Sequence, residues 1–311
     1  MNVGGWRVRL RGWWTSGLPS LLAGLWSVGT LPATILYLFW NPRIHPAYRF
    51  TWPKRFQLGW RMWRTTRGVW TGTSPKAHLV MAVKLLEIPP AIAGVVVECG
   101  CCVGGSTANL SLVCEAIGRQ LIVYDSFEGL PPPTGNDEYA RAKGTGYLRG
   151  DLHVVQANVA RFGRIERCTF RKGWFNDTLP KHTEPIVLAF IDVDYQASLD
   201  DCVRNLWPHL TERGYLFVDE YIYTDFCALF WSERYWRENF DAKPPGLIGS
   251  GSGVGVGQYY LGPVREWNRA NDPGSIAYTR KDLSGYWGFD RSAPTPPDET
   301  REQFGGPELT F

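Results

Sequence analysis

The chain has 311 residues, 44% of them hydrophobic, which is enough for one large α/β domain with extensions or for two small domains. Its net charge of +3 hides a strong asymmetry. The first 86 residues contain nine arginines, three lysines and no acidic residue, whereas the rest holds 21 basic and 30 acidic residues. Nine of the 15 tryptophans also fall in the first part, so the composition predicts a boundary near residues 75 to 90.

The seven cysteines argue against a disulfide framework. Their number is odd, and the neighbours Cys101 and Cys102 could bridge only with strain. A reduced, cytosolic protein is therefore expected. Zinc is an alternative for Cys99, Cys101 and Cys102, but no second cluster of cysteine or histidine at ligand spacing accompanies them.

The predicted N-terminal segment, residues 1–75, is basic and rich in tryptophan. Within it, residues 17–40 are mostly apolar and long enough to cross a bilayer as a helix, with aromatic residues at both edges. Pro19 and Pro32 would break or kink such a helix. A secretory signal peptide fits less well, because the apolar run begins late and no convincing cleavage site follows it. The segment is therefore a candidate membrane anchor.

Residues 54–67 interleave basic and aromatic side chains, which suits an anionic lipid surface. The leading expectation is membrane contact through residues 6–70, with a cytoplasmic body attached to the inner face of the membrane. The competing interpretation is a soluble helix pair whose tryptophans pack onto the body or form a dimer contact. Nucleic-acid binding is not expected, because no recognisable reader fold is present.

From residue 93 the pattern alternates between strands and helices. Continuous apolar runs that end in an acid predict buried parallel strands. The expected strands are 94–98, 121–125, 168–172, 186–192 and 215–219, with a late antiparallel strand at 254–261. The expected helices are 104–117, 151–162, 199–210 and 226–240, the first of them capped by Ser106 or Thr107. Together they predict a doubly wound α/β fold over residues 76–265. Residues 126–150 should form a loop over the carboxyl edge, and residues 266–311 a C-terminal extension with a partly disordered tail.

A glycine-rich loop follows the first predicted strand. Glycines let a backbone come close to a ligand, and the helix N-terminus beyond them offers free N–H groups to a carboxylate. The spacing differs from the G-x-G-x-x-G of dinucleotide folds, which disfavours an NAD-dependent enzyme, although a purely structural turn would look similar. An acid after the second strand could bind both ribose hydroxyls of a nucleoside. The candidate cofactor residues are Glu98, Gly100, Gly104, Gly105, Ser106, Asp125 and Ser126.

Acidic residues also follow the fourth and fifth predicted strands: Asp192 and Asp194 after one, Asp219 and Glu220 after the other. If these strands are neighbours, three or four carboxylates meet at one edge of the sheet and repel each other unless a cation lies among them. Oxygen ligands of this kind suit Mg²⁺ or Ca²⁺. A metal there could lower the pKa of a substrate hydroxyl. The alternative is that one acid points inward and the others face water.

Five sequence blocks resemble a known family. VVECGCCVGGSTANL, YDSFEGLP, GWFNDTLP, FIDVDYQASLDD and LFVDEY occur in the order and spacing of the macrocin O-methyltransferase family, over roughly residues 77–262. Family members methylate sugar or aryl hydroxyls on natural products. The resemblance implies a class I methyltransferase fold, with a Rossmann-like, mostly parallel seven-stranded sheet, S-adenosylmethionine as cofactor and a bound Mg²⁺.

By position, the resemblance assigns Asp192, Asp219 and Glu220 to Mg²⁺. It assigns residues 98–106 to the methionine end of the cofactor, and Asp125 to its ribose. The chain departs from the family at two points. The family usually has two aspartates where this chain has Asp219-Glu220, and a tyrosine where it has Gln196. Both departures point to altered metal geometry, a different substrate or an impaired site.

The sequence therefore predicts a Mg²⁺-assisted O-methyltransferase that uses S-adenosylmethionine. Its acceptor would be a hydroxyl on a sugar, a natural product or a lipid-linked glycan, and Asp192 or Asp194 would take the proton. The alternative is a non-catalytic S-adenosylmethionine-binding protein on the same fold. The other expected partner is a second copy of the chain in a homo-oligomer.

Overall fold

The computed structural model describes residues 43–73, 75–133, 144–221, 226–249 and 276–281. The apolar stretch 17–40, the strand predicted at 254–261 and all but residues 276–281 of the C-terminal extension lie outside the described residues. None of the helices in the described ranges combines the length and hydropathy needed to cross a bilayer.

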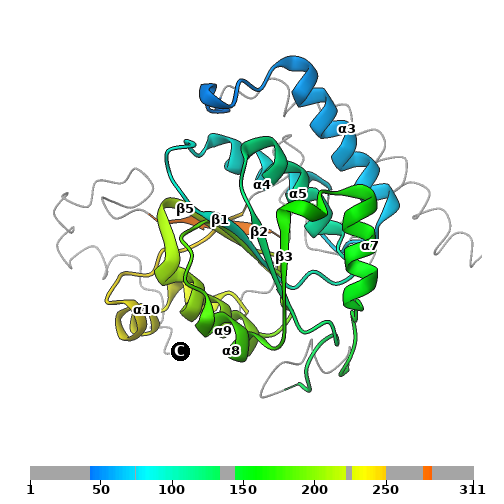
Figure 1. The fold of residues 1–311 in the computed structure, drawn as a ribbon. Coiled ribbons are helices and arrows are strands. Elements are labelled where there is room, and N and C mark those ends of the chain that lie inside the picture. Colours follow the sequence, from blue (N-terminus) through cyan, green and yellow to red (C-terminus); the bar gives the residue numbers. More distant parts are fainter. Residues whose placement is uncertain (1–42, 74, 134–143, 222–225, 250–275, 282–311) are drawn as a thin grey trace, which may run out of the picture. The chain divides into compact units, whose positions relative to one another are not determined.

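A seven-stranded sheet forms the centre of the fold (Figure 1). Its order is β3-β2-β1-β4-β5-β7-β6. The first five strands are parallel, and β7 runs antiparallel to both β5 and β6. This confirms the predicted doubly wound, mostly parallel sheet. The strands are β1 (Val95–Cys99), β2 (Leu121–Asp125), β3 (Cys168–Lys172), β4 (Ile186–Ile191), β5 (Leu210–Val218), β6 (Ile248–Gly249) and β7 (Ala277–Arg280).

The central strands are buried because they are apolar on both faces. All six residues of β4 are buried. Leu188 and Phe190 pack into the core on one face of the sheet, and Ala189 and Ile191 into the core on the other. Parallel strands covered by helices on both sides need this double apolar character, which explains why they read as continuous apolar runs.

Helices cover both faces of the sheet (Figure 1). The core on one face includes residues of α3, α4, α5 and α7, and the core on the other face includes residues of α9 and α10, with α8 packed against α9. The α-helices are α3 (Trp52–Gly68), α4 (Pro75–Glu87), α5 (Gly105–Ile117), α7 (Leu152–Phe162), α8 (Phe175–Thr178), α9 (Gln196–Leu206) and α10 (Glu233–Phe240). Short 3-10 turns are η2 (Pro46–Tyr48), η3 (Ile165–Arg167), η4 (Leu179–Lys181), η5 (Trp207–His209) and η6 (Ala228–Trp231).

Three helix predictions need correction, and the strand expected at 215–219 begins five residues earlier, at Leu210 of β5. The helix expected at 199–210 is α9, which ends at Leu206 before a 3-10 turn containing Pro208, because proline cannot continue the backbone ladder of a helix. The helix expected at 226–240 divides into η6 and α10, and the Ser232 side chain caps α10 by accepting from the Tyr235 N–H. The α5 helix is not capped by Ser106 or Thr107. Its N-cap is Gly104, whose φ of 85° is in the left-handed region that glycine adopts without strain.

Helix α3 lies within the predicted basic segment, whereas α4 begins at Pro75, where that segment was expected to end. Among the described tryptophans of the segment, Trp52, Trp60 and Trp70 are exposed, which does not match the interpretation in which the tryptophans pack onto the body. Leu58 and Met62 supply the contact between α3 and the core instead.

Candidate active site

The carboxyl ends of β4 and β5 hold two acids in fixed positions. The two strands are parallel neighbours, as the sequence analysis required for its acidic cluster. Backbone pairing continues one residue past each strand: the Asp192 N–H donates to Cys99 O at 2.9 Å and the Asp219 N–H donates to Ile191 O at 3.0 Å. The main-chain positions of both acids are therefore set by the sheet, at the edge where ligands of doubly wound sheets bind.

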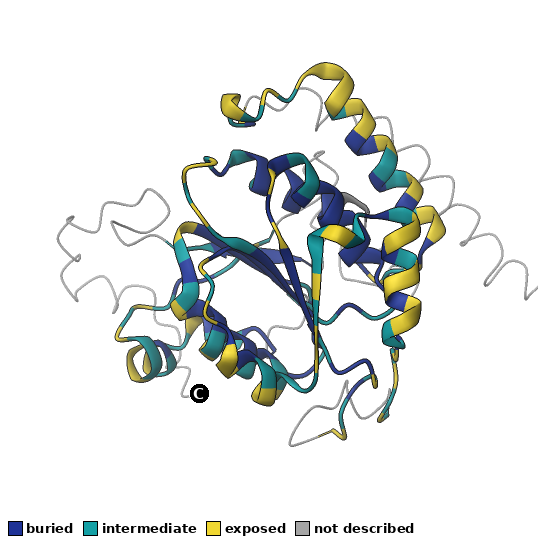
Figure 2. Ribbon diagram, viewed as in Figure 1, coloured by how far each residue is buried: buried dark blue, intermediate teal, exposed yellow. Residues whose placement is uncertain are grey.

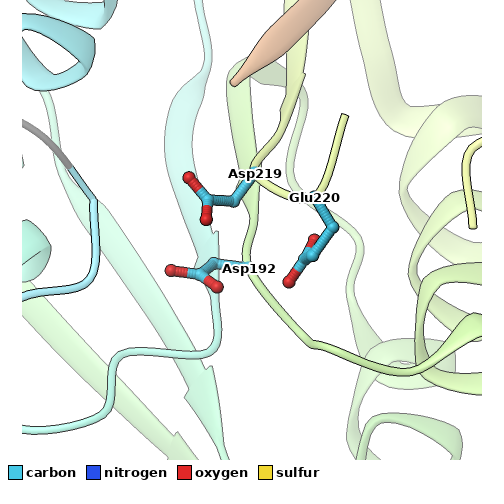
Figure 3. Close-up of side chains that lie close together, drawn as sticks. All are labelled: Asp192, Asp219 and Glu220. Atoms are coloured by element: carbon cyan, nitrogen blue, oxygen red, sulfur yellow. The ribbon is translucent and has the colours of Figure 1, made fainter. Parts of the chain in front are cut away.

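Asp192, Asp219 and Glu220 converge at this edge (Figure 3). Each offers one carboxylate oxygen, and these three oxygens lie within 4.8 Å of one another. The first two side chains are partly exposed and the third is buried. The three acids thus meet at one edge of the sheet, with one of them buried and two partly open to water. The cluster contains no cysteine, and all seven cysteines are free thiols.

The three carboxylates cannot all ionise easily without a cation. Burial, followed by the charges of Asp219 and Glu220, raises the pKa of Asp192 well above its usual range. Burial also raises the pKa of Glu220, with the charges of Asp194 and Asp219 adding to the effect. Desolvation and like charges both disfavour the ionised form, so this site would gain most from a positive charge placed among the oxygens.

The two carboxylate oxygens of Glu220 have different environments. Its Oε1 accepts a hydrogen bond from the Asp194 N–H at 2.8 Å. Its Oε2 is buried and has no hydrogen-bond partner among the described residues. A buried carboxylate oxygen left without a donor is costly, and a hard cation is a ligand that would satisfy it. The donor set, three carboxylates with no nitrogen or sulfur, therefore fits Mg²⁺ or Ca²⁺.

Asp194 lies in the turn that follows β4. Its backbone has a φ of 59°, and its N–H is the group that Glu220 holds. The carboxylate of Asp194 is not part of the three-oxygen cluster, although its charge contributes to the raised pKa values of Asp192 and Glu220. Of the two predicted proton acceptors, the structure therefore places only Asp192 in the cluster.

The glycine loop lies directly beside the acids. Its glycines are required by close packing against other parts of the same chain. A side chain at Gly100, whose φ is 83°, would overlap the backbone oxygen of Asp192. A Cβ at Gly105 would lie 2.8 Å from the Trp70 backbone oxygen, and one at Gly104 would lie 3.0 Å from a Val155 methyl group. The sequence pattern alone indicates that these glycines allow the approach of a ligand. The structure shows that close packing of the chain against itself already requires them.

Glu98 is fully buried at the end of β1. Burial raises its pKa to about 7, and the nearby Ser106 and Thr107 hydroxyls offset part of that effect. Among the described residues, no group donates a well-formed hydrogen bond to either of its carboxylate oxygens. A buried acid of this kind is suited to a cationic or hydroxyl-bearing ligand group.

Asp125 and Ser126 shape the loop that follows β2. Asp125 accepts backbone N–H donors from Cys101 and Phe127, each at 2.7 Å, and so ties the glycine loop to this second loop. A carboxylate has about four acceptor positions, so capacity remains for ribose hydroxyls. The Ser126 hydroxyl donates to Gly129 O and accepts from the Glu128 N–H, each at 3.1 Å, which makes it a turn-forming residue in this structure.

Thr73 is a site residue that the sequence analysis missed. It is buried in the loop between α3 and α4, and its hydroxyl donates to Asp192 Oδ2 at 3.3 Å. The predicted boundary at residue 75 separated it from the acids it contacts. The one signal in the sequence is the short polar turn Thr71-Gly72-Thr73 between two helical segments, which by itself indicates no more than a loop.

Comparison with known proteins agrees with this arrangement. Residues 71–244, more than half of the chain, match the sequence profile of macrocin-O-methyltransferase (TylF). The chain belongs to the macrocin-O-methyltransferase family. The family match begins at Thr71, so it includes the loop that carries Thr73.

Named relatives and a solved structure are consistent with that family assignment. A tetracenomycin-C 4'-O-methyltransferase of Streptomyces olivaceus, named for an 8-demethyl-8-(2,3-dimethoxy-alpha-L-rhamnosyl) compound, is 32% identical over 165 residues, covering 47% of this chain and 63% of the relative. The demethyldecarbamoylnovobiocin O-methyltransferase of Streptomyces niveus is 33% identical over 187 residues, covering 53% of this chain and 70% of the relative. The match thus spans slightly under two thirds of the first relative. The structure of the O-methyltransferase NovP superposes with a TM-score of 0.54 at 23% identity, covering 82% of this chain and 99% of that one. It establishes the same class I methyltransferase fold.

Proposed function

We propose that this member of the macrocin-O-methyltransferase family transfers a methyl group from S-adenosylmethionine to a hydroxyl group of a sugar, natural product or glycolipid, with Mg²⁺ assistance. The observation that carries the proposal is the cluster of three carboxylate oxygens within 4.8 Å of one another, directly beside the glycine loop after β1. Two relatives carry names that describe O-methylation of a rhamnosyl-tetracenomycin and of demethyldecarbamoylnovobiocin, which supports an acceptor of similar chemistry here.

The cofactor half of the site would consist of the predicted residues of the glycine loop and of the β2 end. The first turn of α5 presents backbone N–H groups, to which the methionine carboxylate would bind. Glu98 lies beneath the same loop, and its ionised form would be stabilised by the cofactor ammonium group. Asp125 would accept hydrogen bonds from the ribose hydroxyls, with Ser126 keeping the loop in shape.

The acidic half of the site would hold the acceptor. Asp192, Asp219 and Glu220 would bind Mg²⁺, which when bound lowers the pKa of a coordinated hydroxyl and holds the acceptor in place. The acceptor oxygen would attack the sulfonium methyl group of bound S-adenosylmethionine, with a C–O bond formed as the C–S bond breaks and S-adenosylhomocysteine as the leaving group. The hydroxyl proton would pass to a carboxylate oxygen of Asp192 or Asp194. Thr73 keeps Asp192 oriented by its hydrogen bond.

Two measurements test this function. S-adenosylhomocysteine and NADH are each titrated against the protein by calorimetry, and we expect only the first to bind. Methyl transfer from S-adenosylmethionine to O-demethyl sugars and glycolipids is then measured with Mg²⁺ and with chelator. Binding of S-adenosylhomocysteine without metal affinity or turnover would favour the non-catalytic alternative.

The substitution Asp219→Asn tests the metal assignment. It removes one carboxylate charge but no residue of the glycine loop, so S-adenosylhomocysteine affinity should stay within about twofold, while Mg²⁺-dependent turnover falls by about a hundredfold or more. Turnover that survives both this substitution and chelation would exclude a metal role for the cluster.

A further inference from the structure

Helix α3 (Trp52–Gly68) is attached to the body by one of its faces. Leu58 and Met62 are buried in the core that covers this side of the sheet. Arg61 forms an ion pair with Glu115 of α5 at 3.0 Å, and the Thr65 hydroxyl donates to the backbone oxygen of Phe162 at 3.2 Å. Figure 2 shows the consequence, a helix with a buried inner side and an exposed outer side. The outer side is therefore presented in a fixed orientation.

The outer side is both aromatic and cationic. Trp52, Phe56 and Trp60 are 53%, 53% and 43% exposed. At about 100° per residue, they fall together with Trp63 and Arg67 within an arc of roughly 80° on the helix. The four aromatic residues of this arc, Trp52, Phe56, Trp60 and Trp63, form an aromatic stripe. The Trp63 ring lies 4.7 Å from that of Trp60, and the Arg67 guanidinium lies 5.2 Å from the centre of the Trp63 ring.

The charges on α3 itself have one sign. Arg64 and Arg67 are exposed beside the aromatic stripe, and α3 contains five basic residues and no acidic one. The first 86 residues likewise contain no acid, so no fixed negative charge of that segment neutralises the stripe. Tryptophan and phenylalanine rings enter the headgroup layer of a bilayer, and arginines beside them bind lipid phosphates. Cationic charge near an anionic leaflet adds affinity for every basic residue close to the surface.

We propose that the outer face of α3 docks on an anionic lipid bilayer. Nucleic acid would match the charge, but Trp52, Phe56 and Trp60 are exposed along one side of a single helix, and Trp70 beyond its end is 60% exposed as well. Aromatic rings that extend along one surface suit the plane of a membrane interface.

The docked face is connected to the acidic cluster by a few residues. The chain leaves α3 at Gly68, passes the exposed Trp70 and reaches Thr73, whose hydroxyl contacts Asp192. The Trp70 backbone also lies against Gly105 at the start of α5. The C-terminal end of α3 is therefore five residues along the chain from the threonine that contacts the acidic cluster. A lipid-linked acceptor follows from this only if the methyl-transfer function is correct, whereas the docking itself does not depend on it.

The test uses the full chain and vesicles of phosphatidylcholine with and without phosphatidylglycerol, in a sedimentation assay. We expect partition into the anionic vesicles that weakens as the salt concentration rises, because salt screens the surface charge. Arg64→Glu/Arg67→Glu should weaken partition about tenfold or more, and Trp52→Ala should weaken it on anionic vesicles at every salt concentration.

The chain offers matched controls. Arg234→Glu/Arg237→Glu reverses two exposed arginines at the same spacing on α10, and Trp231→Ala removes a tryptophan that is 50% exposed away from α3. Both should partition as the unchanged protein does. Circular dichroism and S-adenosylhomocysteine affinity identify any variant that fails to fold, and this affinity reports on the proposed function separately. Equal partition of the α3 and α10 variants overturns the proposal, as does binding to a DNA duplex with no binding to anionic vesicles.

Discussion

The Oε1 atom of Glu220 accepts a hydrogen bond of 2.8 Å from the backbone N–H of Asp194, and so joins the end of β5 to the turn after β4. The family resemblance gives an aspartate at this position. The longer glutamate side chain can reach the turn while one of its oxygens lies within 4.8 Å of oxygens from Asp192 and Asp219. The Glu220 side chain thus holds a turn in which Asp194 has a φ of 59°.

Glu220→Gln should raise the thermal midpoint of the metal-free protein by about 2–4 °C, because it removes one of three crowded negative charges and keeps the Oε1 acceptor. The same change should abolish most of the stabilisation that added Mg²⁺ gives. Differential scanning calorimetry with and without Mg²⁺ measures both effects. The exposed residue Glu238 on α10 provides the control, since Glu238→Gln should alter neither. A lower midpoint for Glu220→Gln would show that the carboxylate charge stabilises the fold.

Thr73→Val should lower kcat/KM for methyl transfer by about threefold to tenfold and weaken Mg²⁺ binding by a similar factor. The lost hydrogen bond to a carboxylate contributes to the orientation and ionisation of Asp192, but at 3.3 Å it is long. Thr73→Ser retains the hydroxyl and should restore both values. Magnesium titration followed by calorimetry separates an effect on the site from general loss of folding. If the serine variant is as impaired as the valine variant, the hydroxyl is not the group that matters.

The stability of the metal-free protein should fall as pH rises from about 4.5 to about 7, and Glu98 should account for part of this. Burial raises the pKa of Glu98 in the folded chain to about 7 from its usual 4.5, so folded Glu98 binds a proton that the unfolded chain has released. Stability that is present below the unfolded pKa is therefore lost as pH passes through the folded one, by about 3 kcal/mol in total. Urea unfolding at pH 5.5 and pH 8 measures this difference. It should shrink in Glu98→Gln, and an unchanged difference would exclude Glu98 as the titrating group.

Gly100→Ala should destabilise the protein by about 4 kcal/mol or more, because the new Cβ would overlap the backbone oxygen of Asp192 and the residue has a φ of 83°. Gly118→Ala is the matched control. Gly118 also has a positive φ, of 72°, but a Cβ there meets no atom within 4 Å, so only the backbone strain of about 1–2 kcal/mol should remain. Urea unfolding of the two variants separates strain from steric overlap. Equal losses would show that the contact with Asp192 is relieved by movement of the chain.

The sequence by itself predicted the body of the fold well where one periodicity dominates. The strand predicted at 121–125 has the observed bounds, and the helix predicted at 151–162 begins one residue later, at Leu152. Short apolar runs rich in valine and isoleucine favour strands covered on both faces, so local composition indicates them. The five family blocks likewise indicated Asp192, Asp219 and Glu220 together, and the structure brings these three side chains into one cluster.

Other features were decided by contacts between residues far apart in the chain. The hydrogen bond from Thr73 to Asp192 joins residues 119 positions apart, and no local pattern encodes it. The Glu220 side chain contacts the Asp194 turn and also belongs to the acidic cluster, because β4 and β5 end side by side. The need for glycine at position 100 comes from the backbone of Asp192 on the neighbouring strand. Sequence periodicity determines which residues are buried, whereas only tertiary packing decides which buried groups meet, and this is the physical reason that the acids could be named from the sequence but their neighbours could not.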